Sequence, residues 1–196
     1  AVQPATAAAA RAWCDTQGER ASVESRLATA WLETAVLPKD QRDGKIRETI
    51  TSFVPNHPGE LGQWLVRHGM PEWVAGLAVP EAQLASPAWF QAKAAALRAL
   101  KQWPALLDHL EKAPNSLPPL ELTCDRMIAA AMTGNTARRN LEWKQARDLA
   151  NADSGRNAYL ILAEAAVEAG MQEQAENAMV DALKLGWGRL PLHSRL

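Results

Sequence analysis

The residues best suited to acid–base or metal chemistry lie far apart in this sequence. The four histidines are His57, His68, His109 and His193. None belongs to an HExxH motif or has a carboxylate at metal-ligand spacing. The sequence therefore predicts no metal site, and surface or capping roles are the simplest interpretation of these histidines.

Nucleophilic and phosphate-binding chemistry has no motif here either. Cys14 and Cys124 are the only cysteines, and neither lies in a CxxC or Cys/His arrangement that binds zinc. GxSxG, GxxxxGK[ST] and GxGxxG are all absent. We expect two free, packed thiols in different helical layers, because a disulfide needs Cα atoms within about 7 Å. Since catalysis requires a nucleophile, a base and stabilising groups that converge, the sequence predicts that the chain is not an enzyme and uses no cofactor.

Composition narrows the class of protein further. The chain has 196 residues, 47% of them hydrophobic and 22% charged, which is ordinary for a folded protein. The net charge of -1 provides no basic excess for a phosphate backbone, so nucleic acid is not the expected partner. No apolar run approaches the ~20 residues of a membrane-spanning helix, so we expect no direct membrane insertion of this segment. The compartment stays open between cytoplasmic and extracytoplasmic.

The elements that must position any site are helical. Sustained period-2 alternation is absent, and apolar stripes at three- and four-residue spacing recur about every 16 to 18 residues between Gly, Pro and Asn. Ser86 before Pro87 is typical of a helix start, and Gly134 before Asn135 is typical of a helix end followed by a new cap. The pattern predicts an all-α fold of about 11 helices. Their ranges are 5–17, 19–36, 40–53, 58–68, 71–79, 87–101, 103–112, 119–133, 136–150, 156–169 and 172–185.

The helices form a repeat that is clearest in residues 156–187. Its characteristic positions are Tyr159, Leu162, Ala163, Ala166, Gly170, Ala175, Met179 and Ala182. This order of small and large residues resembles the tetratricopeptide repeat, although Trp187 stands where that family usually has proline. Small residues at Ala163 and Ala175 let paired helices approach closely, and we expect Tyr159 and Met179 to fill the space beside them.

Weaker copies precede it, beginning near Pro58, Phe90 and Met127. The turn residues Gly69, Lys101, Gly134 and Gly170 are separated by steps of 32, 33 and 36 residues, close to the family's period of about 34. The copy that begins near Met127 departs from the family at Arg126 and Arg139, where apolar or small residues are expected. The resemblance implies an α-solenoid of antiparallel helix pairs, a right-handed superhelix as in tetratricopeptide proteins.

The repeat divides the chain into parts of one continuous domain. Residues 1–54 are interpreted as an irregular helical N-terminal cap, since terminal units need a face that tolerates water. Residues 55–187 are the tetratricopeptide-like repeats. Residues 188–196 look like the start of a further element, so we expect a segment of a longer polypeptide.

The resemblance also implies a binding surface. In the family, first-helix residues that face away from the second helix line a concave groove that holds peptides of partner proteins. The lining predicted here is Gln63, Arg67, Gln91, Arg98, Asn157, Glu164 and Glu168.

The eight tryptophans offer a second possible contact surface, since exposed aromatic side chains bind peptides and sugars. Most lie within helical stripes. We expect core positions for Trp31, Trp89, Trp103 and Trp143. We expect partial exposure for Trp64, Trp73 and Trp187.

Two functional hypotheses follow. The first is a protein-interaction scaffold that presents a concave helical groove to a peptide or protein, including other domains of the same longer chain. The alternative is a structural helical segment of a larger enzyme or of a secretion or envelope assembly, with no free ligand.

Overall fold

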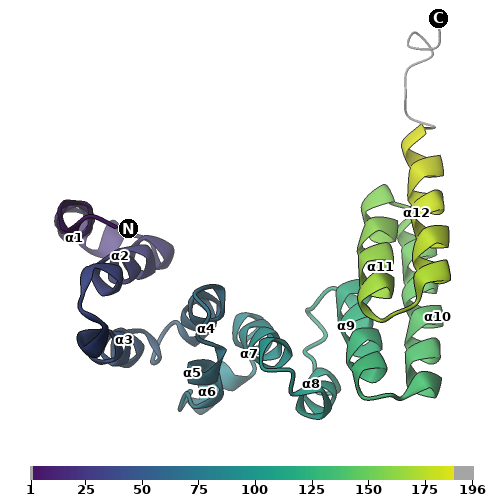
Figure 1. The fold of residues 1–196 in the computed structure, drawn as a ribbon, viewed down its shortest axis with the longest axis horizontal. Helices are drawn as coiled ribbons and strands as arrows, with labels where there is room; N and C mark the ends of the chain where they lie inside the picture. Colours follow the sequence, from purple (N-terminus) through teal and green to yellow (C-terminus); the bar gives the residue numbers. More distant parts are fainter. Residues whose placement is uncertain (1, 188–196) are drawn as a thin grey trace, which may run out of the picture. The chain divides into compact units, whose positions relative to one another are not determined.

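A computed structural model describes residues 2–187, and every regular element in that range is helical (Figure 1). The predicted all-α fold is confirmed, with twelve α-helices and one 3-10 turn in the described range. The further element predicted at 188–196, His193 and the Trp187 side chain lie outside the described residues. Within the described residues, no helix combines the length and apolarity needed to cross a bilayer.

The chain divides into two compact units, residues 1–100 and 101–196, and each is described by itself. The N-terminal cap predicted at residues 1–54 and the repeats predicted at residues 55–187 stay predictions. The helices of the first unit are α1 (Pro4–Gln17), α2 (Val23–Val36), α3 (Lys39–Phe53), α4 (Pro58–Arg67), α5 (Pro71–Ala75), α6 (Glu81–Leu84) and α7 (Pro87–Ala99), with a 3-10 turn at Gly18–Arg20. Those of the second unit are α8 (Trp103–Leu110), α9 (Pro119–Met132), α10 (Thr136–Asp153), α11 (Arg156–Glu168) and α12 (Gln172–Trp187).

Helix α4 is the centre of the first unit, where it contacts α2, α3, α5 and α7. Its Leu61 and Leu65 are fully buried. A Cβ added at Gly59 would lie 2.5 Å from Ala88 Cβ, and one added at Gly62 would lie 2.8 Å from Ala92 Cβ. The two glycines therefore let α4 and α7 approach more closely than any other residue would allow.

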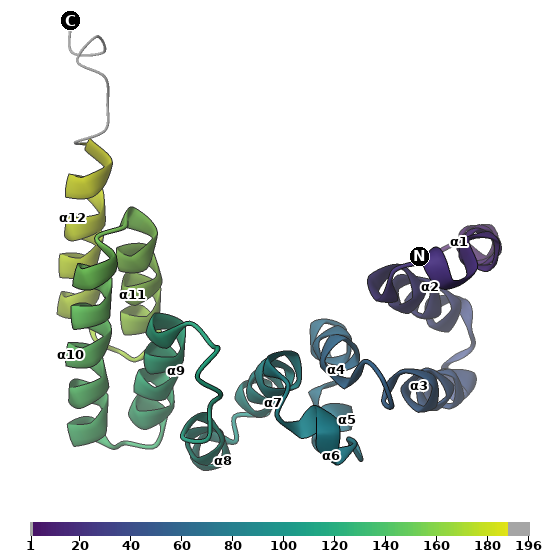
Figure 2. The ribbon, with the colours of Figure 1, turned by 180° about the vertical axis from the view of Figure 1, so that it is seen from behind.

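The second unit contains two helical hairpins, α9 with α10 and α11 with α12. Helix α11 also contacts α9 and α10, and Figures 1 and 2 show the four helices side by side. Small residues line these contacts: Ala163, Ala166, Ala175 and Ala182 are all buried, as the repeat pattern predicts. Met179 is different, because 42% of it is exposed. The prediction that Met179 fills the space beside the alanines is wrong, because this side chain is exposed.

Three of the predicted turn residues end their helices with the same geometry. Gly69, Gly134 and Gly170 have φ values of 75°, 75° and 69°. In each turn the glycine N–H donates to a carbonyl three residues back, and the next N–H donates to a carbonyl five residues back. This is the Schellman arrangement that glycine permits. Lys101, the fourth predicted turn residue, also has a positive φ, 56°, although it carries a side chain.

Local sequence signals predicted most helix ends correctly. The side chain of Ser86 accepts a hydrogen bond from Trp89 N, and that of Asn135 accepts one from Arg138 N, so both predicted caps are confirmed. Helix α6 was not predicted, because a single turn of four residues has no periodicity to detect. Trp64 is only 6% exposed, so its predicted partial exposure is wrong. It packs instead in the α2–α4 core, where its ring meets the edge of Trp31 at 6.3 Å.

Candidate functional site

The four predicted groove residues of the first unit lie on α4 and α7. Gln63 and Arg67 are one turn apart on α4, and Arg67 is exposed while Gln63 is half-buried. Gln91 is exposed on α7 and Arg98 is half-buried two turns later. The buried sides of α4 are occupied by the glycines toward α7 and by Trp64 toward α2. Gln63 and Arg67 therefore lie on the remaining, outward side of their helix.

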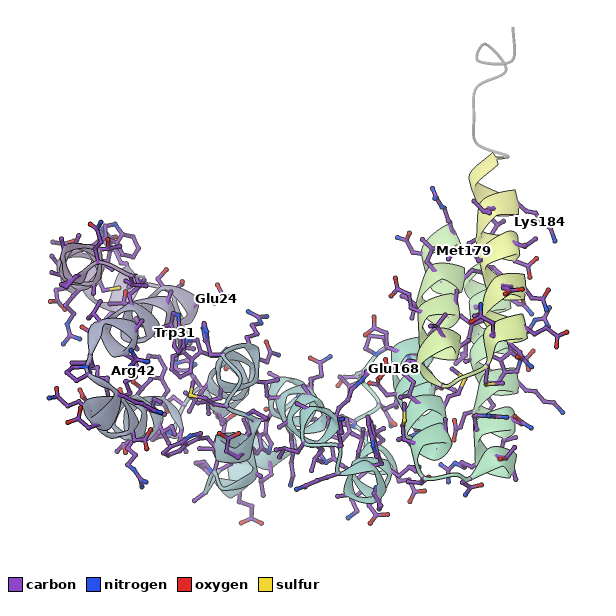
Figure 3. The ribbon with its side chains drawn as sticks, viewed as in Figure 1. Glu24, Trp31, Arg42, Glu168, Met179 and Lys184 are labelled. Carbon is purple, nitrogen blue, oxygen red and sulfur yellow. The ribbon has the colours of Figure 1, made fainter. Side chains whose placement is uncertain are left out.

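The other three predicted residues lie on α11 of the second unit. Asn157, Glu164 and Glu168 are exposed, and their spacing of seven and four residues puts them on one side of the helix (Figure 3 labels Glu168). Helix α9, which packs against α11, carries Glu121 and Asp125 four residues apart, the first exposed and the second half-buried. We call these five residues the acidic face.

Arg126, which departs from the repeat pattern, has a structural role. Its Nη2 donates a hydrogen bond of 2.9 Å to the carbonyl oxygen of Leu110, the last residue of α8. The carbonyls at a helix C-terminus lack partners within the helix. Arg126 therefore ties α9 to the end of α8, which accounts for a basic residue at a position where the family has an apolar or small one.

A polar cleft of about 650 Å³ lies among α1, α2 and α3, and sequence reasoning did not find it. A chain of ion pairs crosses it. Arg11 bridges Asp15 at 3.5 Å and Glu33 at 2.9 Å, and Lys45 bridges Glu33 at 3.0 Å and Glu48 at 3.2 Å. Three helices are thereby joined through alternating charges.

The charges in this series of ion pairs balance one another. Burial alone would lower the pKa of Lys45, but the hydrogen bonds and negative charges of Glu33 and Glu48 outweigh it and raise that pKa above its usual value. Lys45 therefore stays charged at any physiological pH. The i,i+3 pair of Lys45 with Glu48 and the i,i+4 pair of Arg11 with Asp15 were the available sequence signals. The partner Glu33, on a different helix, could be identified only from the fold.

Cys14 lies on the wall of the same cleft. Its Sγ is 3.1 Å from Thr29 Oγ1 and 3.8 Å from the carbonyl oxygen of Ser25. Cys124 is buried in the other unit, and both thiols are free, as predicted. Burial, with the negative charges of Asp125 and Glu121, raises the pKa of Cys124 to about 12. A thiol in that state is a packing group and not a nucleophile.

Aromatic side chains join α2 and α4. Trp31 stacks on His68 with ring centroids 3.9 Å apart and planes 18° apart, and Trp64 meets His68 edge-on at 5.3 Å. Burial and then the charge of Arg67 lower the pKa of His68. The imidazole is thus neutral at physiological pH and acts as a packing ring.

A smaller hollow of about 450 Å³ lies between α3 and α5. The Arg47 guanidinium is 5.1 Å from the ring centroid of Trp73 there, a cation–π contact. Trp73 is half-buried, in line with its predicted partial exposure. Because Arg47 already covers the ring, the tryptophan offers no open platform to a ligand.

Among the described residues, no group of three or more His, Cys, Asp or Glu side chains is arranged to hold a metal ion.

Comparison with known proteins finds one partial likeness to report. The chain is 34% identical over 136 residues to the mouse (Mus musculus) protein named Immunity-related GTPase family Q protein, and this covers 68% of the chain and 21% of that protein. The chain thus spans about a fifth of the length of the curated relative it matches. No protein-family model matches the chain, and no solved structure matches it.

Proposed function

We propose that the chain is a protein-interaction scaffold built from tetratricopeptide-like hairpins that stack as an α-solenoid. The observation that carries this proposal is the recurrence of one turn. Gly69, Gly134 and Gly170 end three of the four predicted first helices, α4, α9 and α11, with the same left-handed φ and the same pair of hydrogen bonds. A unit repeated in this way buries its inner face against its neighbours and leaves the outer face of each first helix for a partner.

The acidic face is the binding surface of the second unit in this proposal. Glu164 and Asn157 are exposed on α11, and Glu121 is exposed on the adjacent helix α9. The negative charges of Glu164 and Glu121 favour partner segments that carry Lys or Arg. Rim charges of this kind act mainly on the rate of association and on the salt dependence of binding.

The outward side of α4 and α7 is the corresponding surface of the first unit. Arg67 and Arg98 carry positive charges on it, Gln63 and Gln91 are hydrogen-bonding neighbours, and the exposed Glu60 adds one negative charge on the same side of α4. A partner bound there is expected to present carboxylates. The close α4–α7 contact holds the backbones of the two helices near each other.

A structural segment of a larger protein is the alternative. The likeness to part of a protein named as a GTPase favours it, because this sequence has no GxxxxGK[ST] loop to cradle a nucleotide phosphate. Under this alternative the helices position a catalytic part elsewhere in a longer chain and bind no free partner.

A capture experiment with one charge-altered variant per unit tests the scaffold. The second-unit variant is Asn157→Lys with Glu164→Lys. Its control, Gln145→Lys with Asp148→Lys, makes the same change of charge at exposed positions of α10. The first-unit variant is Gln63→Glu with Arg67→Glu, matched by Gln41→Glu with Lys39→Glu on α3.

Partners captured from native lysate are identified by mass spectrometry and then tested singly as purified proteins. The proposal expects at least one purified partner whose affinity falls at least about tenfold with one face variant and stays unchanged with its matched control. Equal loss with the control, or no direct binding by any purified protein, would favour the structural alternative.

A further inference from the structure

Helix α12 carries an apolar face that its own hairpin does not cover. Met179, Val180 and Leu183 are 42%, 48% and 47% exposed. Their spacing puts them on one side of the helix, while Ala178 and Ala182 on another side are buried (Figure 3 labels Met179). Three large apolar side chains grouped on one face differ from the scattered exposure that is normal in folded proteins.

The preceding second helix shows that the repeat does not require apolar residues at two of these three positions. The turns at Gly134 and Gly170 are alike, so a position of α12 corresponds to the position 36 residues earlier in α10. Val180 and Leu183 then correspond to Lys144 and Arg147, which are exposed and charged, whereas Met179 corresponds to Trp143, which is 9% exposed. Apolar residues on α12 thus replace charges that the same site in α10 tolerates.

The charged residues next to the apolar residues differ between the two ends of α12. Glu173 and Glu176 are exposed one to two turns before Met179 and Val180. Gln172 donates a hydrogen bond to Glu176, which leaves its charge in place. At the other end Lys184 is paired with Asp181 at 3.0 Å, so the two charges cancel. The face is therefore apolar in the middle and acidic toward the start of α12.

We propose that this face binds an amphipathic helix of a partner protein, whose apolar stripe covers Met179, Val180 and Leu183 and whose Lys or Arg residues lie against Glu173 and Glu176. An apolar stripe of this width is what a helix packs against. The binding is separate from that of the acidic face, because it uses a second helix and different side chains. The inference therefore goes beyond the scaffold function proposed above.

Charge decides among the possible occupants. A second copy that paired through its own α12 would bring Glu173 and Glu176 again and a Lys184 that Asp181 neutralises, so the described part of that helix supplies no unpaired cation. An anionic lipid surface would be repelled by the same two glutamates. A helix with a basic end satisfies both the apolar and the charged part of the face.

Methyl NMR of the protein labelled with [¹³C-methyl]methionine tests the proposal directly. The probe is a synthetic helix of about five turns with leucines at helical spacing and lysines at one end. A matched peptide carries glutamates in place of the lysines. We expect the Met179 signal to shift saturably with the lysine peptide, with an affinity at least about tenfold higher than for the glutamate peptide. The signal of Met132, 44% exposed on α9, should not move.

The variant Val180→Lys with Leu183→Arg reproduces the residues of α10 and should fold normally, which circular dichroism verifies. It should weaken binding of the lysine peptide at least about tenfold. Asn157→Lys with Glu164→Lys should leave that binding unchanged, so failure of the acidic face and failure of this face are distinguishable.

The proposal is overturned if millimolar lysine peptide leaves Met179 unmoved, or if Val180→Lys with Leu183→Arg binds the peptide as well as the wild type does. A Met179 shift that depends on protein concentration alone would make the occupant a second copy. A shift produced by anionic lipid vesicles but not by the peptide would make it a membrane, and either result contradicts the inference.

Discussion

Single residues decide how closely the helices of the first unit pack. At Gly59 an added Cβ would lie 2.5 Å from Ala88 Cβ and 2.8 Å from the backbone nitrogen of Trp89. Backbone atoms cannot move aside as the tip of a side chain can. Gly44 on α3 is the contrasting case, because nothing lies within 4 Å of a Cβ placed there.

Gly59→Ala is expected to lower the free energy of unfolding by about 1–3 kcal/mol, because the methyl group forces α4 and α7 apart. Gly44→Ala should raise it by about 0.5–1 kcal/mol, since alanine loses less entropy in a helix than glycine does. Urea denaturation of the two variants measures both changes. Equal effects of the two substitutions would show that the α4–α7 contact is not as close as described.

Cys124 should resist thiol reagents in the folded protein. With a pKa of about 12 instead of the usual 9.0, on the order of 10⁻⁴ of this thiol is ionised at pH 8. Iodoacetamide labelling followed by peptide mass spectrometry should modify the half-buried Cys14 first and Cys124 only in denaturant. Rapid labelling of Cys124 in native buffer would contradict its burial.

The same pKa predicts a loss of stability in alkali. The folded pKa lies above the unfolded one, so the buried neutral thiol contributes its stability below pH 9 and loses it as pH rises toward 12. Cys124→Ala should reduce the alkaline loss measured by thermal unfolding between these pH values. An identical pH profile in the variant would refute the assignment.

Sequence reasoning located residues well where a local rule applied and poorly where only the fold decides. Ser86 and Asn135 were identified as caps because a cap needs only its next three residues. Trp64 and Met179 were misassigned, one expected exposed and the other buried, because burial depends on which neighbouring helix covers each face. The predicted groove residues Arg67 and Glu164 are exposed in the structure, and their binding role stays a prediction.

At the scale of elements, the turns give the repeat its period. Helix bounds agreed with the predicted ranges to within a few residues, because apolar periodicity and Gly, Pro and Asn signals coincide at most ends. The range predicted for α5 was too long: the helix ends at Ala75, before Gly76 and Pro80. Helix α10 was predicted too short, and it runs on to Asp153.

At the turn residues with positive φ, adding a side chain should lower stability and removing one should raise it. Gly170→Ala should cost about 1–2 kcal/mol, because φ of 69° brings Cβ against the following carbonyl. Lys101→Gly should stabilise by up to about 1 kcal/mol, since it relieves the same strain at φ of 56°. Thermal unfolding of both proteins measures this, and a destabilising Lys101→Gly would show that its side chain makes compensating contacts.

At the scale of the whole molecule, the chain is two compact units, each with its own buried cluster. This division was not predicted, because the repeat period runs through residue 100 without interruption. The polar cleft of the first unit also escaped prediction. Its ion-pair chain joins Arg11, Glu33 and Lys45 from three helices, and sequence spacing places only residues of the same helix together.

Because each unit has its own core, we expect the two units to open independently of each other. In hydrogen exchange read by mass spectrometry, Gly59→Ala should speed exchange in peptides of residues 1–100 and leave residues 101–187 unchanged. Gly170→Ala should do the reverse. Acceleration in both units by either substitution would show that the chain unfolds as one cooperative body.

The central claim, that outward first-helix faces bind partners, is tested most directly by carboxyl footprinting of the protein with a purified partner whose binding the Asn157→Lys with Glu164→Lys variant weakens. Carbodiimide labelling with and without that partner is quantified at each glutamate by mass spectrometry. We predict that bound partner protects Glu121 and Glu164 and leaves Glu48 and Glu60 in the other unit labelled as before. Unchanged labelling of Glu121 and Glu164 in a saturated complex would contradict the account.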